Sequence, residues 1–292
     1  MLYIFLTILF ITAIGIIFKT FPKYNINAFQ AIVCNYAICV LMSWLHSGSF
    51  PLNANLINLP WFPIAIALSV CFIVGFYLQS VIYNFFGIAV SSIVLKLSLL
   101  LTALFSITYY SESLPITKII GLVLALVAIV LVSFPQEGSL FKSERIKSKH
   151  WIILVVSYFI AGAVEIGFIF VERSASAQSA DPQFIGAATG MAFLIGFVWE
   201  NIRIQRAQSQ FEFKNIKAGV ALGIVNYLTF WGMLKSVATG IDASVVFTAI
   251  NIGVILIAAL LGVLFYKEKL VALNIVGVVT AIVDVCLIAY VV

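Results

Sequence analysis

Charge is what this sequence lacks most. Only 9% of its 292 residues are Asp, Glu, Lys or Arg, whereas 63% are hydrophobic. A soluble globular chain is about half apolar and about a quarter charged. No soluble core hides this much Leu, Ile, Val and Phe without leaving large apolar patches in water. The composition therefore excludes a soluble protein and predicts an integral membrane protein.

Residues used for metal binding and nucleophilic catalysis are also scarce. The chain has only two histidines, His46 and His150, and its four cysteines all lie inside apolar runs. They form no Cys/His cluster at metal-ligand spacing, and HExxH, GxSxG and Walker sequences are missing. We therefore expect no enzyme activity, no metal, no cofactor and no nucleotide-driven process.

What the sequence does contain is a series of long, continuous apolar runs. A membrane-spanning helix needs about 20 such residues, whereas a spanning strand needs about 10 with alternating polarity. The breaks carry Pro, Asn and Ser, as in FPKYN and SESLP, which end one helix or cap the next. These runs predict an all-α integral membrane protein with ten transmembrane helices, over residues 2–19, 27–46, 61–84, 88–110, 115–134, 151–171, 183–202, 216–235, 242–265 and 270–291.

The longest polar segment, FPQEGSLFKSERIKSKHW, divides the chain near its middle. We predict an N-terminal five-helix repeat at 1–134, a basic linker at 135–150 and a C-terminal five-helix repeat at 151–292. An odd number of helices in each half turns the second half over in the membrane. Such inverted repeats are common in secondary transporters, whose substrates bind near the midplane between the repeats.

The two halves share a sequence pattern. GIAVSSIVLKLS followed by YYSESL in the first half matches GIDASVVFTAIN followed by FYKEKL in the second. The match places Ser98 opposite Asn251, on a polar stripe that both halves share and that we assign to helix packing. Lys96 falls opposite Ala249, so the fold does not require a lysine there in both halves.

These motifs resemble the EamA-type drug/metabolite transporter superfamily. There, each half ends with a small-residue helix, a turn that contains Glu and a helix that bears Gly; Glu112 and Glu268 match the turn, and Gly121 and Gly277 match the glycine. The resemblance implies a five-plus-five helical fold that moves small metabolites, often amino acids, by alternating access. It also implies that both termini lie inside the cell.

The basic residues predict the opposite orientation. They collect in the odd-numbered connections between helices, for example Lys23, Lys147 and Arg203. The positive-inside rule places these connections in the cytoplasm and both termini outside the cell (inner or plasma) membrane. We adopt the orientation that the basic residues predict. Because topology accounts for the net charge of +5, we expect no nucleic-acid partner.

Three ionisable residues stand out because they lie inside the predicted helices and away from their ends: Lys96, Glu165 and Asp284. A charge at the bilayer centre costs several kcal/mol, so such residues usually face a cavity and a partner. Helical periodicity puts Lys96 on the face of helix 88–110 opposite Ser98 and Thr102, from where its stem reaches towards Glu165. Asp284 shares its face with small residues and reads as a buried carboxylate in close packing.

Two main interpretations of Lys96 and Glu165 stay open. In the first, they form a structural ion pair within the bundle. In the second, Lys96 binds an anionic group of a substrate, such as a carboxylate, and Glu165 binds a substrate amine or a coupling proton. Snorkelling of Lys96 towards the interface is a third, smaller alternative.

Further polar and aromatic side chains lie within the apolar spans. Polar groups at membrane depth need partners, which a cavity or a neighbouring helix supplies equally well. The predicted substrate-binding set is Lys96, Glu165, Gln79, Tyr83, Tyr158, Asn226, Tyr227 and Trp231.

Together these patterns predict a secondary transporter, an exporter or facilitator of small polar metabolites, with amino acids favoured. Its expected partners are the lipid bilayer, the small-molecule substrate and, as a candidate coupling ion, the proton. The alternative is a non-transporting membrane scaffold or accessory subunit.

Overall fold

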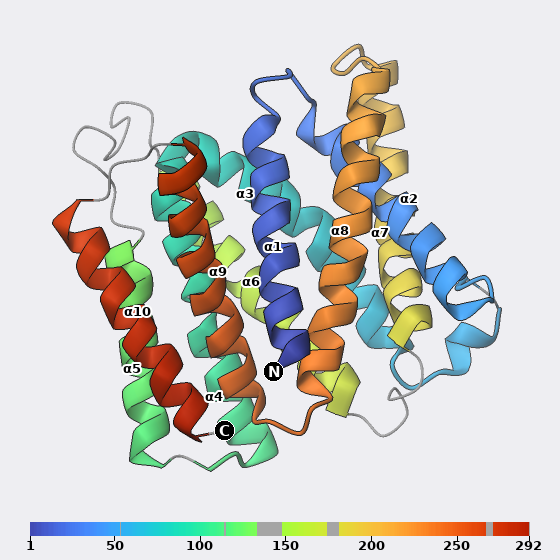
Figure 1. The fold of residues 1–292 in the computed structure, drawn as a ribbon. Helices are drawn as coiled ribbons and strands as arrows, with labels where there is room; N and C mark the ends of the chain where they lie inside the picture. Colours follow the sequence, from blue (N-terminus) through green and yellow to red (C-terminus); the bar gives the residue numbers. More distant parts are fainter. Residues whose placement is uncertain (53, 114, 133–147, 174–180, 267–270, 292) are drawn as a thin grey trace. The chain divides into compact units, whose positions relative to one another are not determined.

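A computed structural model of the chain describes residues 1–52, 54–113, 115–132, 148–173, 181–266 and 271–291. These residues form ten α-helices and one short 3-10 helix, η1, and no strand occurs among them (Figure 1). The all-α class and the ten helices are thus confirmed. The helices are α1 (Leu2–Thr20), α2 (Ala28–Ser47), α3 (Phe62–Lys96), α4 (Leu99–Tyr110), α5 (Ile116–Val132), α6 (Ser148–Arg173), α7 (Asp181–Gln205), α8 (Phe213–Val237), α9 (Ala243–Tyr266) and α10 (Ala272–Val291), with η1 at Ala54–Asn58.

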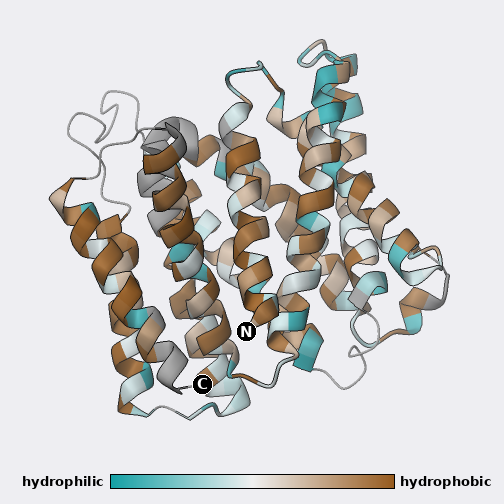
Figure 2. Ribbon diagram, in the orientation of Figure 1, coloured by the Kyte–Doolittle hydropathy of each residue, from teal (hydrophilic) through white to brown (hydrophobic). Residues whose placement is uncertain are grey.

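Many of the helices have the length and apolar composition of membrane-spanning segments. Within the described residues, 6 helices contain a stretch long and apolar enough to cross a bilayer, and α1, α4, α5 and α10 add shorter apolar stretches. Figure 2 shows apolar residues along most of the length of α1, α9 and α10, and hydrophilic residues gathered where α7 and α8 are connected. This distribution follows from the scarcity of charge in the sequence.

The ends of α2 show how local sequence sets a helix boundary. The Asn27 side chain accepts hydrogen bonds from the backbone N–H groups of Phe29 and Gln30, which have no partner inside the helix. At the other end Gly48 adopts a left-handed conformation (φ 69°), and its N–H bonds to the carbonyl of Trp44. The Asn and Gly therefore delimit α2 as their preferences predict.

The boundary between α3 and α4 differs from the prediction. We placed a break between residues 84 and 88, but α3 continues through Lys96 and the break falls at Leu97–Ser98. A single Gly such as Gly87 costs a helix only about 1 kcal/mol, which does not stop an apolar run that continues on both sides. At the observed break, Leu100 bonds back to Leu97 over three residues, as in a 3-10 turn. Lys96 is therefore the last residue of α3 and not a mid-helix residue.

The chain divides into two compact units. Unit 1 contains residues 1–9, 78–166 and 239–292, and unit 2 contains residues 10–77 and 167–238. Each unit draws on both halves of the sequence. Most of the predicted basic linker lies outside the described residues.

Each unit contains a closely packed antiparallel helix pair, α5 with α10 in unit 1 and α2 with α7 in unit 2. In unit 1, Asn274 at the start of α10 donates hydrogen bonds to the carbonyls of Leu131 and Val132 at the end of α5 (3.0 and 2.9 Å). In unit 2, Ser43 near the end of α2 bonds to the carbonyl of Pro182 at the start of α7. These contacts fix the direction of each pair.

Two glycines of α8 allow its backbone to approach α2. A Cβ on Gly223 would lie 2.7 Å from the carbonyl oxygen of Asn35, and one on Gly219 would lie 2.7 Å from that of Ala31. The Cys39 thiol also donates to the carbonyl of Gly223 at 3.4 Å. Backbone-to-backbone contact of this kind is typical of helix pairs in membranes, where small residues let helices come close.

Replacing Gly223 by Ala is expected to lower stability by about 1–3 kcal/mol, because the added methyl group has to push α2 away. The matched control is Gly15→Ala in α1, where a Cβ meets nothing within 4 Å. This control should be neutral or up to about 1 kcal/mol more stable, because Ala favours helix over Gly. Thermal unfolding in detergent measures both. Equal melting temperatures for Gly223→Ala and wild type would contradict the close α2–α8 contact.

Candidate functional site

A cluster of charged and polar side chains in unit 1 comes from four helices, α3, α4, α6 and α9. Lys96, the last residue of α3, donates from its ammonium to Oδ1 of Asn251 on α9 at 2.8 Å. Nδ2 of Asn251 donates in turn to Oε1 of Glu165 on α6 at 3.3 Å, and Thr102 Oγ1 on α4 donates to Oε2 of Glu165 at 2.5 Å. We call Lys96, Thr102, Glu165 and Asn251 the Lys96 cluster.

The members of the Lys96 cluster differ in burial. The linking groups are buried, with Thr102 0% and Asn251 1% exposed, whereas Lys96 and Glu165 keep part of their surface accessible. Charges need either a partner or water in apolar surroundings. The Asn251 amide between them accepts from one N–H of Lys96 and donates to one oxygen of Glu165. A lysine ammonium carries three N–H donors in all. The cluster therefore places a lysine and a glutamate, linked through the Asn251 amide, at the edge of a buried region.

The predicted approach of Lys96 to Glu165 is thus present, but it runs through an amide that the sequence assigned to helix packing. Asn251 and Thr102 are the members that sequence reasoning missed. The available signal was the repeat itself, which sets Asn251 where the first half has the smaller Ser98. Where the repeat matches two positions, a longer amide side chain at one of them indicates a contact that only that half of the chain makes.

The other predicted site residues of unit 1 lie on the same long helices. Tyr158 on α6 and Gln79 on α3 are both partly exposed. Tyr83 falls in α3, but its side chain lies outside the part of the chain that is described.

The three predicted residues of α8 belong to unit 2 and have partners there. Asn226 Nδ2 donates to Oδ1 of buried Asn35 at 3.0 Å. The Tyr227 hydroxyl lies 2.7 Å from Nδ1 of His46, and the ring of Trp231 packs edge-on against the same histidine. In unit 2 these side chains make helix–helix contacts between α2 and α8.

A second charged group of unit 1 lies where α4 ends and α5 begins. Lys118 donates to Glu112 at 3.1 Å and to Asp242 at 2.9 Å, and both Lys118 and Glu112 are buried. Glu112 also accepts from the backbone N–H of Ala243 (2.8 Å) and from the hydroxyl of Ser244 (2.6 Å), so it caps the start of α9. We call these residues the Lys118 network.

The environment of Glu112 favours its charged form. Burial raises the pKa of this carboxyl, but the hydrogen bonds from Ser244 and Lys118 outweigh burial, and the pKa lies below its ordinary value. Glu112, which follows the end of α4, thus contacts the start of α9. Its predicted equivalent, Glu268, lies outside the described residues.

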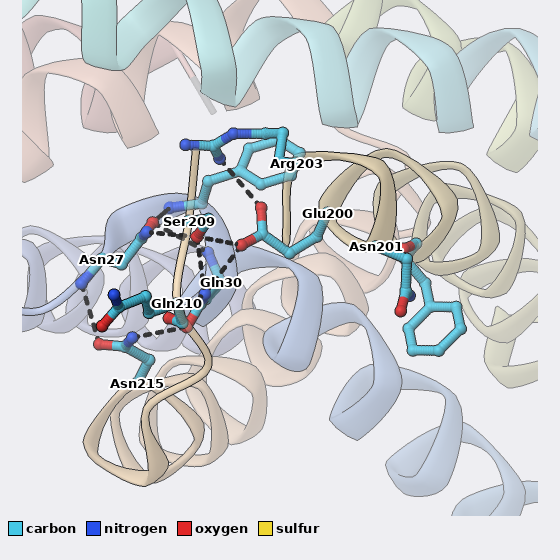
Figure 3. Close-up of polar contacts among 10 residues, drawn as sticks. Asn27, Gln30, Glu200, Asn201, Arg203, Ser209, Gln210 and Asn215 are labelled. Carbon is cyan, nitrogen blue, oxygen red and sulfur yellow. Dashed lines mark hydrogen bonds and ion pairs between the residues drawn. The ribbon is translucent and has the colours of Figure 1, made fainter. Parts of the chain in front are cut away.

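Unit 2 contains a buried polar cluster of neutral amides around one carboxylate (Figure 3). The amide of Gln30 on α2 donates to Oε1 of Glu200 (2.8 Å) and to Oγ of Ser209 (2.9 Å), and its oxygen accepts from Asn215 (2.6 Å). Arg203 pairs with the other oxygen of Glu200 at 2.9 Å. The cluster ties the connection between α7 and α8 to the start of α2.

Replacing Gln30 by Ala is expected to loosen this connection. The variant leaves Glu200 and Asn215 without the amide, and each unmet buried polar group costs about 1–3 kcal/mol. Limited proteolysis at residues 206–212, followed by mass spectrometry, should therefore cut the variant several times faster than wild type. The control is Asn201→Ala: Asn201 points away from the cluster in Figure 3 and bonds to the carbonyl of Phe197 in its own helix. Equal cleavage of Gln30→Ala and the control would show that the cluster does not hold the connection.

The described side chains bring together no group of three or more His, Cys, Asp or Glu that is able to hold a metal ion.

The architecture is that of a polytopic helical membrane protein with charged clusters inside its helical units. No family model matches the sequence. The chain is 26% identical over 278 residues to an uncharacterized protein of Haemophilus influenzae, covering 91% of this chain and 90% of that protein. A solved crystal structure is similar over 99% of this chain and 96% of its own, with a TM-score of 0.78 and 14% sequence identity. The structural likeness establishes a shared fold and carries no information on activity.

Proposed function

We propose that this protein is a secondary transporter of the EamA type, an exporter or facilitator of small polar metabolites. Transport proceeds by alternating access, with a central site between two inverted five-helix repeats. The observation that carries the proposal is the Lys96 cluster. A lysine and a glutamate, both partly exposed, lie in an apolar helical bundle that contains few charged residues. Intramembrane charges of this kind mark substrate and ion pathways in membrane proteins.

The inverted repeat is supported by the way the helices pair. The packing of α5 with α10 and of α2 with α7 is antiparallel, as it is between elements related by an axis in the membrane plane. The Lys96 cluster also combines the two halves of the sequence: Lys96 and Thr102 come from the first half, Glu165 and Asn251 from the second. A site built in this way changes its geometry when the halves move against each other.

The chemistry of the Lys96 cluster favours substrates that carry both charges. The ammonium of Lys96 suits a carboxylate, and the carboxylate of Glu165 suits an amine or a proton. Amino acids present both groups on one carbon atom, and hydrophobic cations are disfavoured by Lys96. The basic connections place both termini outside the cytoplasm in this proposal.

The proposal is tested with purified protein in proteoliposomes. Vesicles loaded with single radiolabelled amino acids or with organic cations are assayed for uptake and efflux, with and without a pH gradient. We expect saturable flux for at least one zwitterionic substrate, and no flux in protein-free vesicles. Folded protein that moves none of the substrates in either direction would favour the alternative, a membrane scaffold or accessory subunit.

A further inference from the structure

The helix α10 carries one carboxyl group that neither the Lys96 cluster nor the Lys118 network uses. Asp284 lies in the interior of α10 and is 0% exposed. Neither of its carboxyl oxygens has a hydrogen-bond donor among the described residues. Its Oδ1 faces Gly121 on α5, where an added Cβ would lie 3.4 Å from that oxygen.

Among the described residues, the helices packed against α10 offer Asp284 no free cation. α10 packs on α5 and α9. In the sequence of α5 the sole charged residue is Lys118, and its ammonium is bound to Glu112 and Asp242. The sequence of α9 contains no Asp, Glu, Lys, Arg or His, and α10 contains none besides Asp284.

An ionised carboxylate in such surroundings is strongly disfavoured. Burying a charge without a partner costs far more than burying a neutral polar group, so the group gives up its charge. A hard metal cation does not supply the missing charge, because Mg²⁺ and Ca²⁺ take six or more oxygen ligands. A single proton on the carboxyl removes the charge and needs no further ligand.

We propose that Asp284 is a proton-binding site of unit 1, protonated while α5 and α10 are packed together and ionised only when the two helices part or admit water. The site is separate from Lys96 and Glu165. The proposal does not depend on transport, because its test measures stability and protonation without a substrate.

The pH dependence of stability follows from the proton count. The folded protein binds one more proton than the unfolded chain over the pH range in which the exposed aspartate is ionised and the buried one is not. The contribution of Asp284 to stability is therefore full at low pH and is lost as the pH rises. Where the difference is a whole proton, the unfolding equilibrium constant rises tenfold per pH unit.

The experiment compares wild type with Asp284→Asn by thermal and denaturant unfolding in detergent between pH 5 and 9. We expect wild type to lose stability relative to the variant as pH rises, and the variant to be at least as stable at pH 9. Glu212→Gln, which removes a carboxylate that is 45% exposed, is the control and should follow wild type. Parallel curves for wild type and Asp284→Asn would overturn the proposal.

An infrared measurement on the wild type keeps the test decisive if the variant fails to fold. A protonated carboxyl has a C=O stretching band distinct from that of a carboxylate, and this band should fade over the pH range in which wild-type stability falls. Absence of the band at low pH would overturn the proposal. So would recovery of stability at pH 9 on adding Na⁺ or Ca²⁺ at constant ionic strength, because a metal ion would then occupy the site.

Discussion

The double variant Lys96→Met/Glu165→Gln is expected to recover the stability that each single variant loses, but not to recover transport. Each single change leaves the other charge without its compensation in apolar surroundings. Breaking a fully buried pair costs about 3–5 kcal/mol. Because Lys96 and Glu165 are partly exposed, we expect a smaller loss, about 1–3 kcal/mol. The double variant removes both charges and restores neutrality.

Under the proposed function, transport is expected to respond differently, because the substrate binds to the charges themselves. A hydrogen bond to a charged group contributes about 1.5–3 kcal/mol, which corresponds to a loss of about 10- to 100-fold in flux for each group removed. Unfolding in detergent and initial rates in proteoliposomes measure the two effects on the same preparations. Lys149→Met, at an exposed position in the first turn of α6, is the control for loss of a lysine. A double variant with wild-type flux would show that Lys96 and Glu165 form a structural ion pair and nothing more.

The second large effect is expected on stability at the Lys118 network. Lys118→Met leaves the Glu112 carboxylate buried without its cation and should lower the free energy of unfolding by about 3–5 kcal/mol. The control is Lys214→Met, which removes an ion pair with Glu212 in which both side chains are over 40% exposed. Such a surface pair contributes at most about 1 kcal/mol. Similar losses in the two variants would contradict the structural role of Lys118.

The pH dependence at Glu112 has a defined sign. Its pKa in the folded protein is depressed, so the contribution to stability is present above the ordinary glutamate pKa of about 4.3 and is lost as the pH falls through the lower folded value. Wild type should therefore lose stability below about pH 4. In Lys118→Met the loss should begin at higher pH, because the lysine no longer favours the charged carboxylate. Melting temperatures of wild type and Lys118→Met between pH 3 and 6 show whether the loss of stability in acid begins at higher pH in the variant.

The sequence by itself determined the class of this protein and the number of its helices. Composition excludes a soluble fold at any arrangement of the chain, because too few charged residues exist to cover a surface. Apolar runs of spanning length form helices wherever they pack, since the bilayer leaves the backbone no other partners. Local signals such as Asn27 and Gly48 act within a few residues and were visible in the sequence for the same reason.

Only the tertiary structure decided what Lys96 meets. On a continuous helix from 88 to 110, periodicity places Lys96 and Thr102 on opposite faces. The turn at Leu97–Ser98 interrupts that helix, and both side chains reach one cluster with Glu165 and Asn251. Where a long apolar run breaks depends on the helices packed against it. No Pro stands at this break, and the side chain of Ser98, at the N-cap position of α4, makes no capping hydrogen bond. The partner of a buried charge is a contact between distant segments, and such contacts exist only after the chain has folded.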